Sequence, residues 1–216
     1  MKNKKKWFTY ALAGTVAVSS LSVMQFNSEA EAKQAKKDPT NVIMLVMDGS
    51  SNNAVSLARW YKGESLAMDE ILTGGVTTHS AESAITDSAP AGTALATGHK
   101  SNSGYVGVLP SVIDMPGVNG NPNDAFTPVA NVLEGAKQLG KATGIVSTSE
   151  IQHATPASFS SHVTSRSNYD DIGEQQVYQN MDVILGGGYD YLKSENRKDG
   201  ENLVSVIEEK GYDLLT

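Results

Sequence analysis

The chain has 216 residues, of which 39% are hydrophobic and 19% are charged, and this composition excludes a chain that is disordered along its whole length. Its formal net charge of −7 disfavours nucleic acid as a partner, because an acidic surface repels the phosphate backbone. Cysteine is absent, which excludes disulfides and thiolate metal sites. Any metal ion must therefore be held by oxygen ligands or imidazole.

The first residues have the pattern of an export signal. Four lysines among residues 2–6 precede a weakly apolar stretch over 7–24, and Ala30-Glu31-Ala32 has the small-residue spacing of a cleavage site. We predict a signal peptide over 1–32 and a flexible, lysine-rich tail over 33–40. The protein is then secreted or held at the cell envelope, and it meets a membrane only through this signal. The alternative is a retained anchor, since the apolar stretch approaches spanning length.

An apolar run at the start of the remaining chain, residues 41–216, indicates a buried sheet. Residues 41–47 (Asn-Val-Ile-Met-Leu-Val-Met) are almost continuously apolar, which is typical of a strand covered on both faces, as in a parallel sheet. Asp48 follows at the carboxyl end of this strand. A helix is expected over 52–72 and a short strand over 76–79.

A helix of small residues is predicted over 88–97. Its N-cap is Asp87 or Thr86, Pro90 is tolerated in the first turn, and Gly98 ends the helix. The further elements that we expect are a surface loop over 100–124, a helix over 127–139, a strand over 142–148, a helix over 171–181, a strand over 183–188, a helix over 201–210 and a strand over 212–215. This alternation favours an α/β fold with a doubly wound, mainly parallel sheet flanked by helices.

Three side chains carry possible chemistry. Asp48 lies at the strand end where such sheets bind ligands, and its carboxylate is a candidate cation ligand, although an Asp-Gly pair also simply turns a chain. Ser88 lies at a helix start, where backbone N–H groups favour an anion, although a serine or threonine there is more often a plain cap. Arg166 has a planar fork that can bind two phosphate oxygens, although an exposed arginine is usually just solvated.

Several segments, taken in order, resemble the alkaline phosphatases. They are the strand ending at Asp48-Gly49, Thr86-Asp87-Ser88-Ala89, Thr97-Gly98, Gly144-Ile145-Val146-Ser147-Thr148, Ala154-Thr155-Pro156-Ala157, His162-Val163-Thr164-Ser165-Arg166 and Leu185-Gly186-Gly187-Gly188. The resemblance covers most of the chain after the export signal. It implies hydrolysis of phosphate monoesters through a phosphoserine, with two Zn²⁺ ions and one Mg²⁺ ion, for phosphate scavenging.

The resemblance also implies roles for single residues. Ser88 is similar to the serine that becomes phosphorylated, and Arg166 to the arginine that binds the non-transferring oxygens, with Asp87 orienting both. Asp48 resembles the carboxylate that bridges a zinc ion and the magnesium ion. Thr155 resembles the hydroxyl ligand of magnesium.

His153 stands where some members of this family have an aspartate near the magnesium site and others a histidine. An imidazole there removes one negative charge, so the resemblance implies weaker magnesium retention than in the aspartate type.

The same resemblance leaves the site unfinished. The family takes most of its zinc ligands from the later half of the chain, and the four histidines of this sequence, the last of which is His162, match none of them. We therefore expect a fold that is incomplete at its C-terminal end, and a homodimer for the full-length family member. The alternatives are an inactive truncated remnant and, within the same superfamily, an enzyme for sulfate esters or phosphodiesters.

Overall fold

The computed structural model describes residues 40–215 and divides the chain into two units, Met1–Val46 and Met47–Thr216. The predicted signal peptide and nearly all of the predicted tail lie outside the described residues. The described part of the first unit, residues 40–46, has neither helix nor strand and is exposed. All the helices and strands that the structure describes belong to the second unit.

The second unit begins with α1 (Asn52–Lys62) and a 3-10 helix (Ala67–Ile71), where one helix over 52–72 was expected. Gly63 divides them, because its φ of 76° is the left-handed conformation that closes a helix. Ser51 starts α1 by accepting the N–H of Ala54 at 3.3 Å. Neither helix buries a residue.

The middle of this unit contains α2 (Ser88–Thr97), a 3-10 turn (Pro122–Asp124) and α3 (Val132–Gln138). The prediction for α2 is confirmed at both ends, since the Asp87 side chain caps it and Gly98 closes it with a φ of 77°. The α3 helix is shorter than expected, because its N-cap is Asn131.

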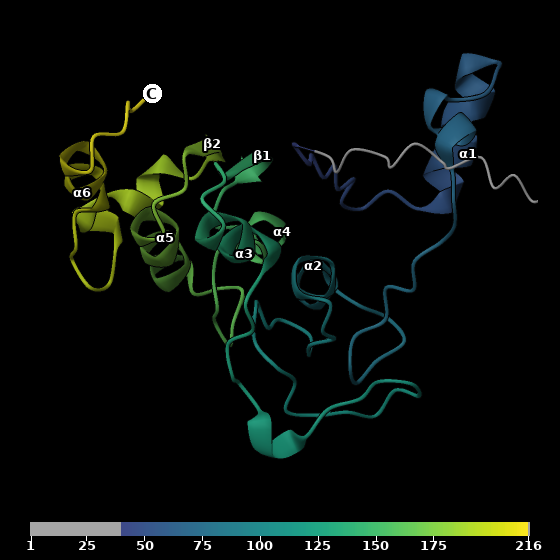
Figure 1. Cartoon of the computed structure of the whole chain (residues 1–216), viewed down its shortest axis with the longest axis horizontal. Helices are drawn as coiled ribbons and strands as arrows, with labels where there is room; N and C mark the ends of the chain where they lie inside the picture. Colours follow the sequence, from purple (N-terminus) through teal and green to yellow (C-terminus); the bar gives the residue numbers. More distant parts are fainter. Residues whose placement is uncertain (1–39, 216) are drawn as a thin grey trace, which may run out of the picture. The chain divides into compact units, whose positions relative to one another are not determined.

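The last part of this unit contains the sheet. Its elements are β1 (Gly144–Glu150), α4 (Ala154–Ala157), α5 (Tyr169–Tyr178), β2 (Val183–Gly187), two 3-10 helices (Tyr189–Leu192 and Ser194–Asn196) and α6 (Leu203–Glu209). The strands are parallel and adjacent, with Gly144 opposite Val183 and Val146 opposite Leu185, and α4 and α5 lie in the connection between them (Figure 1). Within residues 40–215 these are the only two strands of the sheet.

Three expected strands are therefore wrong for the described residues. Residues 41–47, 76–79 and 212–215 have irregular backbone, and Ile43 and Leu45 are 86% and 87% exposed. The physical reason is that a strand is completed by its neighbours: its backbone needs a hydrogen-bonding partner and its apolar side chains need cover. No strand among residues 40–215 pairs with any of these segments. The apolar pattern predicts a strand on the condition that neighbouring strands pair with it and other elements cover it. Residues 40–215 do not provide these neighbours.

The expected surface loop over 100–124 is also partly wrong. Residues Ser101, Asn102, Val106 and Val108 are buried, and Val106 pairs with Val163 in an antiparallel bridge with two hydrogen bonds of 2.9 Å. Gly107 makes this close approach possible, because its φ is 62° and a Cβ atom there would lie 2.2 Å from the Ser161 carbonyl oxygen. The first half of the segment is thus folded against residues 161–166.

A core of small residues lies directly under the chemistry-bearing positions. It consists of Ala89, Val106, Ala154, Ala157, Val163 and Ile172, each no more than 6% exposed. It joins the start of α2 to α4, α5 and the bridge at Val106. Because Ser88, Thr155 and Arg166 are within three positions of its members, this core fixes the backbone from which their side chains project.

Candidate active site

Asp48 brings together two hydroxyl groups from distant parts of the sequence. Its Oδ1 atom accepts a hydrogen bond from the Ser88 hydroxyl at 3.2 Å, and its Oδ2 atom accepts one from the Thr155 hydroxyl at 2.6 Å. The bond from Thr155 is the main cause of a lowered pKa at Asp48, opposed by burial and supported by the bond from Ser88. Asp48 is therefore a carboxylate anion that faces solvent and carries a hydroxyl group on each oxygen.

Ser88 is the first residue of α2 and so lies at the positive end of the helix dipole. Asp87 precedes it, and three groups contact the Asp87 carboxylate. Its Oδ1 atom accepts the N–H of Ala89 at 2.7 Å and faces an Arg166 nitrogen at 3.4 Å, while its Oδ2 atom accepts the N–H of Gly104 at 2.8 Å. These contacts fix the backbone turn that presents the Ser88 hydroxyl.

Arg166 is the cation of this cluster. Besides its long contact with Asp87, its second terminal nitrogen lies 3.1 Å from the Nε2 atom of His153. A guanidinium only donates hydrogen bonds, so that Nε2 must be the acceptor, and the ring proton of His153 is on Nδ1. The Arg166 side chain is 29% exposed, which leaves its remaining N–H groups accessible to an anion.

The structure thus places all six predicted site residues in two hydrogen-bonded groups. One is Asp48 with Ser88 and Thr155, and the other is Asp87 with Arg166 and His153. The groups touch along the chain, because Asp87 precedes Ser88 and His153 lies two residues before Thr155. A serine hydroxyl, a partly exposed guanidinium and an exposed carboxylate are therefore neighbours, and metal-assisted transfer of a phosphoryl group uses groups of these kinds.

Sequence reasoning missed the contribution of the turn at Asn102–Tyr105. Gly104 donates its N–H to Asp87 and accepts the N–H of Arg166 at 2.7 Å. The available signal was Asn-Ser-Gly, a turn composition, in a segment that was expected to be a plain surface loop. The other histidines make their ring contacts elsewhere. The ring nitrogens of His162 face the Gly107 carbonyl oxygen and Glu134, and the Nδ1 atoms of His79 and His99 face the carbonyl oxygens of Ser80 and Thr97.

The donor set suits one of the two predicted metals. A carboxylate and a hydroxyl supply oxygen ligands, which Mg²⁺ prefers. Zinc in proteins usually takes three or four protein ligands with nitrogen or sulfur among them, and the cluster offers only His153, whose Nε2 already faces Arg166. The described residues therefore fit Mg²⁺ and do not complete a site for either Zn²⁺ ion.

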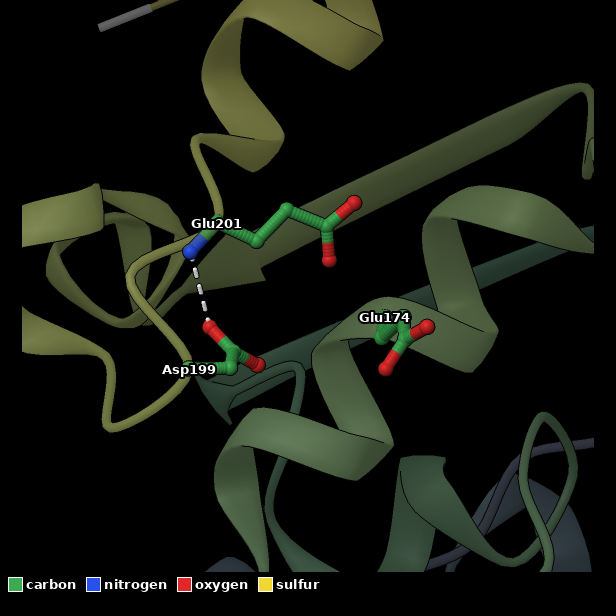
Figure 2. Close-up of side chains that lie close together, drawn as sticks. All are labelled: Glu174, Asp199 and Glu201. Carbon is green, nitrogen blue, oxygen red and sulfur yellow. Dashed lines mark hydrogen bonds between the residues drawn. The ribbon is translucent and has the colours of Figure 1, made fainter.

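One acidic cluster lies apart from these residues. Glu174, Asp199 and Glu201 have ligand oxygens within 4.8 Å of one another, the only such group that residues 40–215 form (Figure 2). The buried guanidinium of Arg197 is paired with Asp199 and lies 3.7 Å from Glu201. Arg197 offsets part of this acidic charge, and Asp199 and Glu201 belong to a structural ion-pair network with it. Among residues 40–215, no helix is long and apolar enough to cross a membrane.

Comparison with known proteins identifies the family. The alkaline phosphatase family model matches residues 39–216. Alkaline phosphatase 4 of Bacillus subtilis is 37% identical over 219 residues, which cover 94% of this chain and 44% of that protein. The structure of the cold-active alkaline phosphatase from a Shewanella species superposes with a TM-score of 0.64 at 34% identity, covering 78% of this chain and 39% of that one.

A further structural neighbour is the alkaline phosphatase from the Antarctic bacterium TAB5, in a variant that has glutamate in place of a histidine and was solved with Mg bound in its M3 site. It superposes with a TM-score of 0.61 at 25% identity, and covers 77% of this chain and 45% of that one. The chain belongs to the alkaline phosphatase family. It spans less than half the length of these relatives.

Proposed function

We propose that the protein is an exported, metal-dependent phosphomonoesterase that scavenges phosphate, and that its full site needs residues beyond those described. The observation that carries the proposal is the double contact of Asp48 with Ser88 and Thr155, beside the pair of Asp87 and Arg166. Family membership supports phosphate monoesters as the substrates. By the same resemblance we propose a doubly wound parallel sheet and a homodimer for the complete protein.

The residues divide the work of binding and attack. The fork of Arg166 binds two non-transferring oxygens of the phosphate, and Asp87 keeps the fork aimed at them. The Ser88 oxygen then attacks phosphorus as the ester P–O bond breaks, and a phosphoserine forms. The hydroxyl proton of Ser88 passes through solvent to the departing oxygen, which leaves as the alcohol, and water later hydrolyses the phosphoserine to Ser88 and inorganic phosphate. Asp48 is a weak proton acceptor because its pKa is lowered, so it serves better as a cation ligand than as a general base.

Metal ions complete this division of work. Asp48 and Thr155 would hold Mg²⁺, with His153 beside them, and Asp48 would also give one ligand to zinc. When bound, the cations would supply positive charge that stabilises a serine alkoxide and a leaving-group oxygen. Ser88 therefore needs no histidine base.

The decisive experiment compares two lengths of chain with 4-nitrophenyl phosphate in the presence of Zn²⁺ and Mg²⁺. The complete coding sequence is expected to give a metal-dependent enzyme that forms a phosphoserine on residue 88, detectable by mass spectrometry. Ser88→Ala should lower turnover by at least about 10³-fold. Ser167→Ala changes an exposed serine near Arg166 and is the matched control, expected to keep full activity.

Hydrolysis that survives Ser88→Ala would contradict the proposal. The 216-residue chain alone is expected to be inactive, since its described residues do not complete the zinc sites. This same observation favours the second candidate, an inactive truncated remnant. An immediate stop codon after Thr216 would support the remnant, whereas an open frame that supplies further Asp and His residues supports the enzyme.

A further inference from the structure

A single residue, Gly104, touches both charged members of the phosphate-binding pair. Its N–H donates to Asp87 at 2.8 Å, and its carbonyl oxygen accepts the backbone N–H of Arg166 at 2.7 Å. A displacement of Gly104 therefore moves the arginine and its carboxylate partner together. The aim of the guanidinium depends on the turn that contains Gly104, which closes with a bond of 3.0 Å from the Tyr105 N–H to the Asn102 carbonyl oxygen.

The turn is not held by packing around Gly104. This residue has a φ of 80°, and a Cβ atom added to it would meet no other heavy atom within 4 Å. Glycine is needed there for its backbone conformation and not to save space. The restraint on the turn must come from its other residues.

Glu82 supplies that restraint. One of its carboxylate oxygens accepts the backbone N–H of Ser103 and the other accepts the side-chain amide of Asn102, each at 2.8 Å. Asn102 is 5% exposed, and its side-chain oxygen accepts the N–H groups of Ser111 and Val112 at 2.7 and 2.9 Å. Glu82 thereby fixes the two residues that precede Gly104.

We propose that Glu82 is a positioning residue for Arg166, acting through the turn at Asn102–Tyr105. It makes no hydrogen bond to Ser88 or Arg166, and its effect passes to the arginine through Gly104. The inference rests on the proposed function only in assigning phosphate as the anion that Arg166 binds. The positioning itself is a property of the chain and can be measured without activity.

The first test measures amide hydrogen exchange by NMR on the full 216-residue chain. Glu82→Ala should accelerate exchange of the Gly104 and Arg166 amides by about tenfold, because both are then protected only by a turn that opens more often. Glu82→Gln keeps the shape and one acceptor, so it should give a smaller acceleration at the same two amides. Glu195→Ala removes an exposed glutamate and is the matched control, with no change expected.

The amides of β1 show whether a variant is simply less stable. If they accelerate as much as Gly104 and Arg166 in both Glu82 variants, the loss is general and the proposal is overturned. Unchanged exchange at Gly104 and Arg166 also overturns it. Selective acceleration at these two amides supports it, whatever reaction the protein catalyses.

The second test uses a double-mutant cycle on a chain long enough to hydrolyse phosphate esters. Inhibition by inorganic phosphate should weaken about tenfold in Glu82→Ala, and Glu82→Ala should have no further effect once Arg166 has been changed to Ala. Independent, additive losses would mean that Glu82 acts elsewhere and would overturn the proposal. Failure of the proposed function would instead appear as hydrolysis that survives Ser88→Ala, and the exchange result would stand.

Discussion

Hydrogen-bond donors keep the carboxylates of Asp48 and Glu82 ionised. The first faces solvent and the second faces the protein. Asp48 faces solvent and gives its charge to the site, and its pKa is lowered chiefly by the Thr155 hydroxyl. Glu82 faces the turn at Asn102–Tyr105. Burial opposes its charge, but bonds from Ser103, Asn102 and Ser80 outweigh burial and lower its pKa to about 2. Asp48 is therefore available to a cation, whereas both oxygens of Glu82 already accept hydrogen bonds from the protein.

Glu82 should make the stability of the protein depend on acid. Its pKa of about 2 in the folded protein lies below the ordinary glutamate value of 4.5, so its contribution to stability is fully present above about pH 4.5 and is lost as the pH falls toward 2. At pH 7 we expect Glu82→Gln to lower the free energy of unfolding by about 1–2 kcal/mol, less than the full pKa shift implies because the carboxylate is partly exposed.

Urea unfolding at pH 7, 4.5 and 3 checks this prediction. The difference between wild type and Glu82→Gln should shrink as the pH falls, and Glu195→Gln should show no such difference at any pH. A difference that stays constant from pH 7 to 3 would show that the charge of Glu82 contributes nothing and that only its shape matters.

At the scale of elements, the contact of α2 with α4 sets the distance between the hydroxyl groups of Ser88 and Thr155. Gly92 on α2 faces Ser158, which follows α4 and whose hydroxyl donates to the carbonyl oxygens of Ala154 and Ala89 at 2.8 and 3.2 Å. A Cβ atom at Gly92 would lie 2.7 Å from the Ser158 oxygen and 3.0 Å from its Cβ atom. The two segments approach closely because neither has a large side chain at this point.

Two glycine substitutions in helices should therefore have opposite signs. Gly92→Ala forces Ser158 to rotate away from its two acceptors and should lower the free energy of unfolding by about 1–2 kcal/mol. Gly135→Ala in α3 meets no heavy atom within 4 Å and should raise it by about 0.5–1 kcal/mol, because alanine favours the helix. Thermal or urea unfolding of both variants measures this. Equal effects of one sign would contradict the packing argument.

Most helices and the two strands β1 and β2 could be predicted from local signals, and the strands expected over 41–47, 76–79 and 212–215 could not. The cap at Asp87 and the stop at Gly98 are properties of a few neighbouring residues, and α2 formed where these predicted it. The apolar run at 41–47 predicts a strand only if partners exist, and within the described residues there are none. Similarly, Asp48, Ser88, Thr155 and Arg166 were identifiable from motifs, whereas the support from Glu82 and Gly104 depends on a turn that has no motif.

At the scale of the whole molecule, the two-stranded sheet has one covered face and one open face. Ile145 and Ile184 are paired across the strands, and Ile145 is 7% exposed within a core with Met181. Val146 and Leu185, the next pair, point to the other face and are 74% and 48% exposed. Parallel sheets in α/β proteins are normally covered on both faces. The open face agrees with a chain that spans less than half the length of its relatives.

This open face should make the 216-residue chain self-associate, and a charge placed on it should reduce that association. Val146→Lys puts an ammonium on an exposed position, so it should cost no more than about 1 kcal/mol of stability while lowering the association that sedimentation velocity detects over a concentration series. Ile145→Lys, one residue away on the covered face, buries an unpaired charge and should unfold the protein or cost more than about 3 kcal/mol. If Val146→Lys associates as strongly as wild type, the contact between chains forms elsewhere. The exposed apolar run at 42–47 would then be the next segment to test, by the same substitution at Ile43.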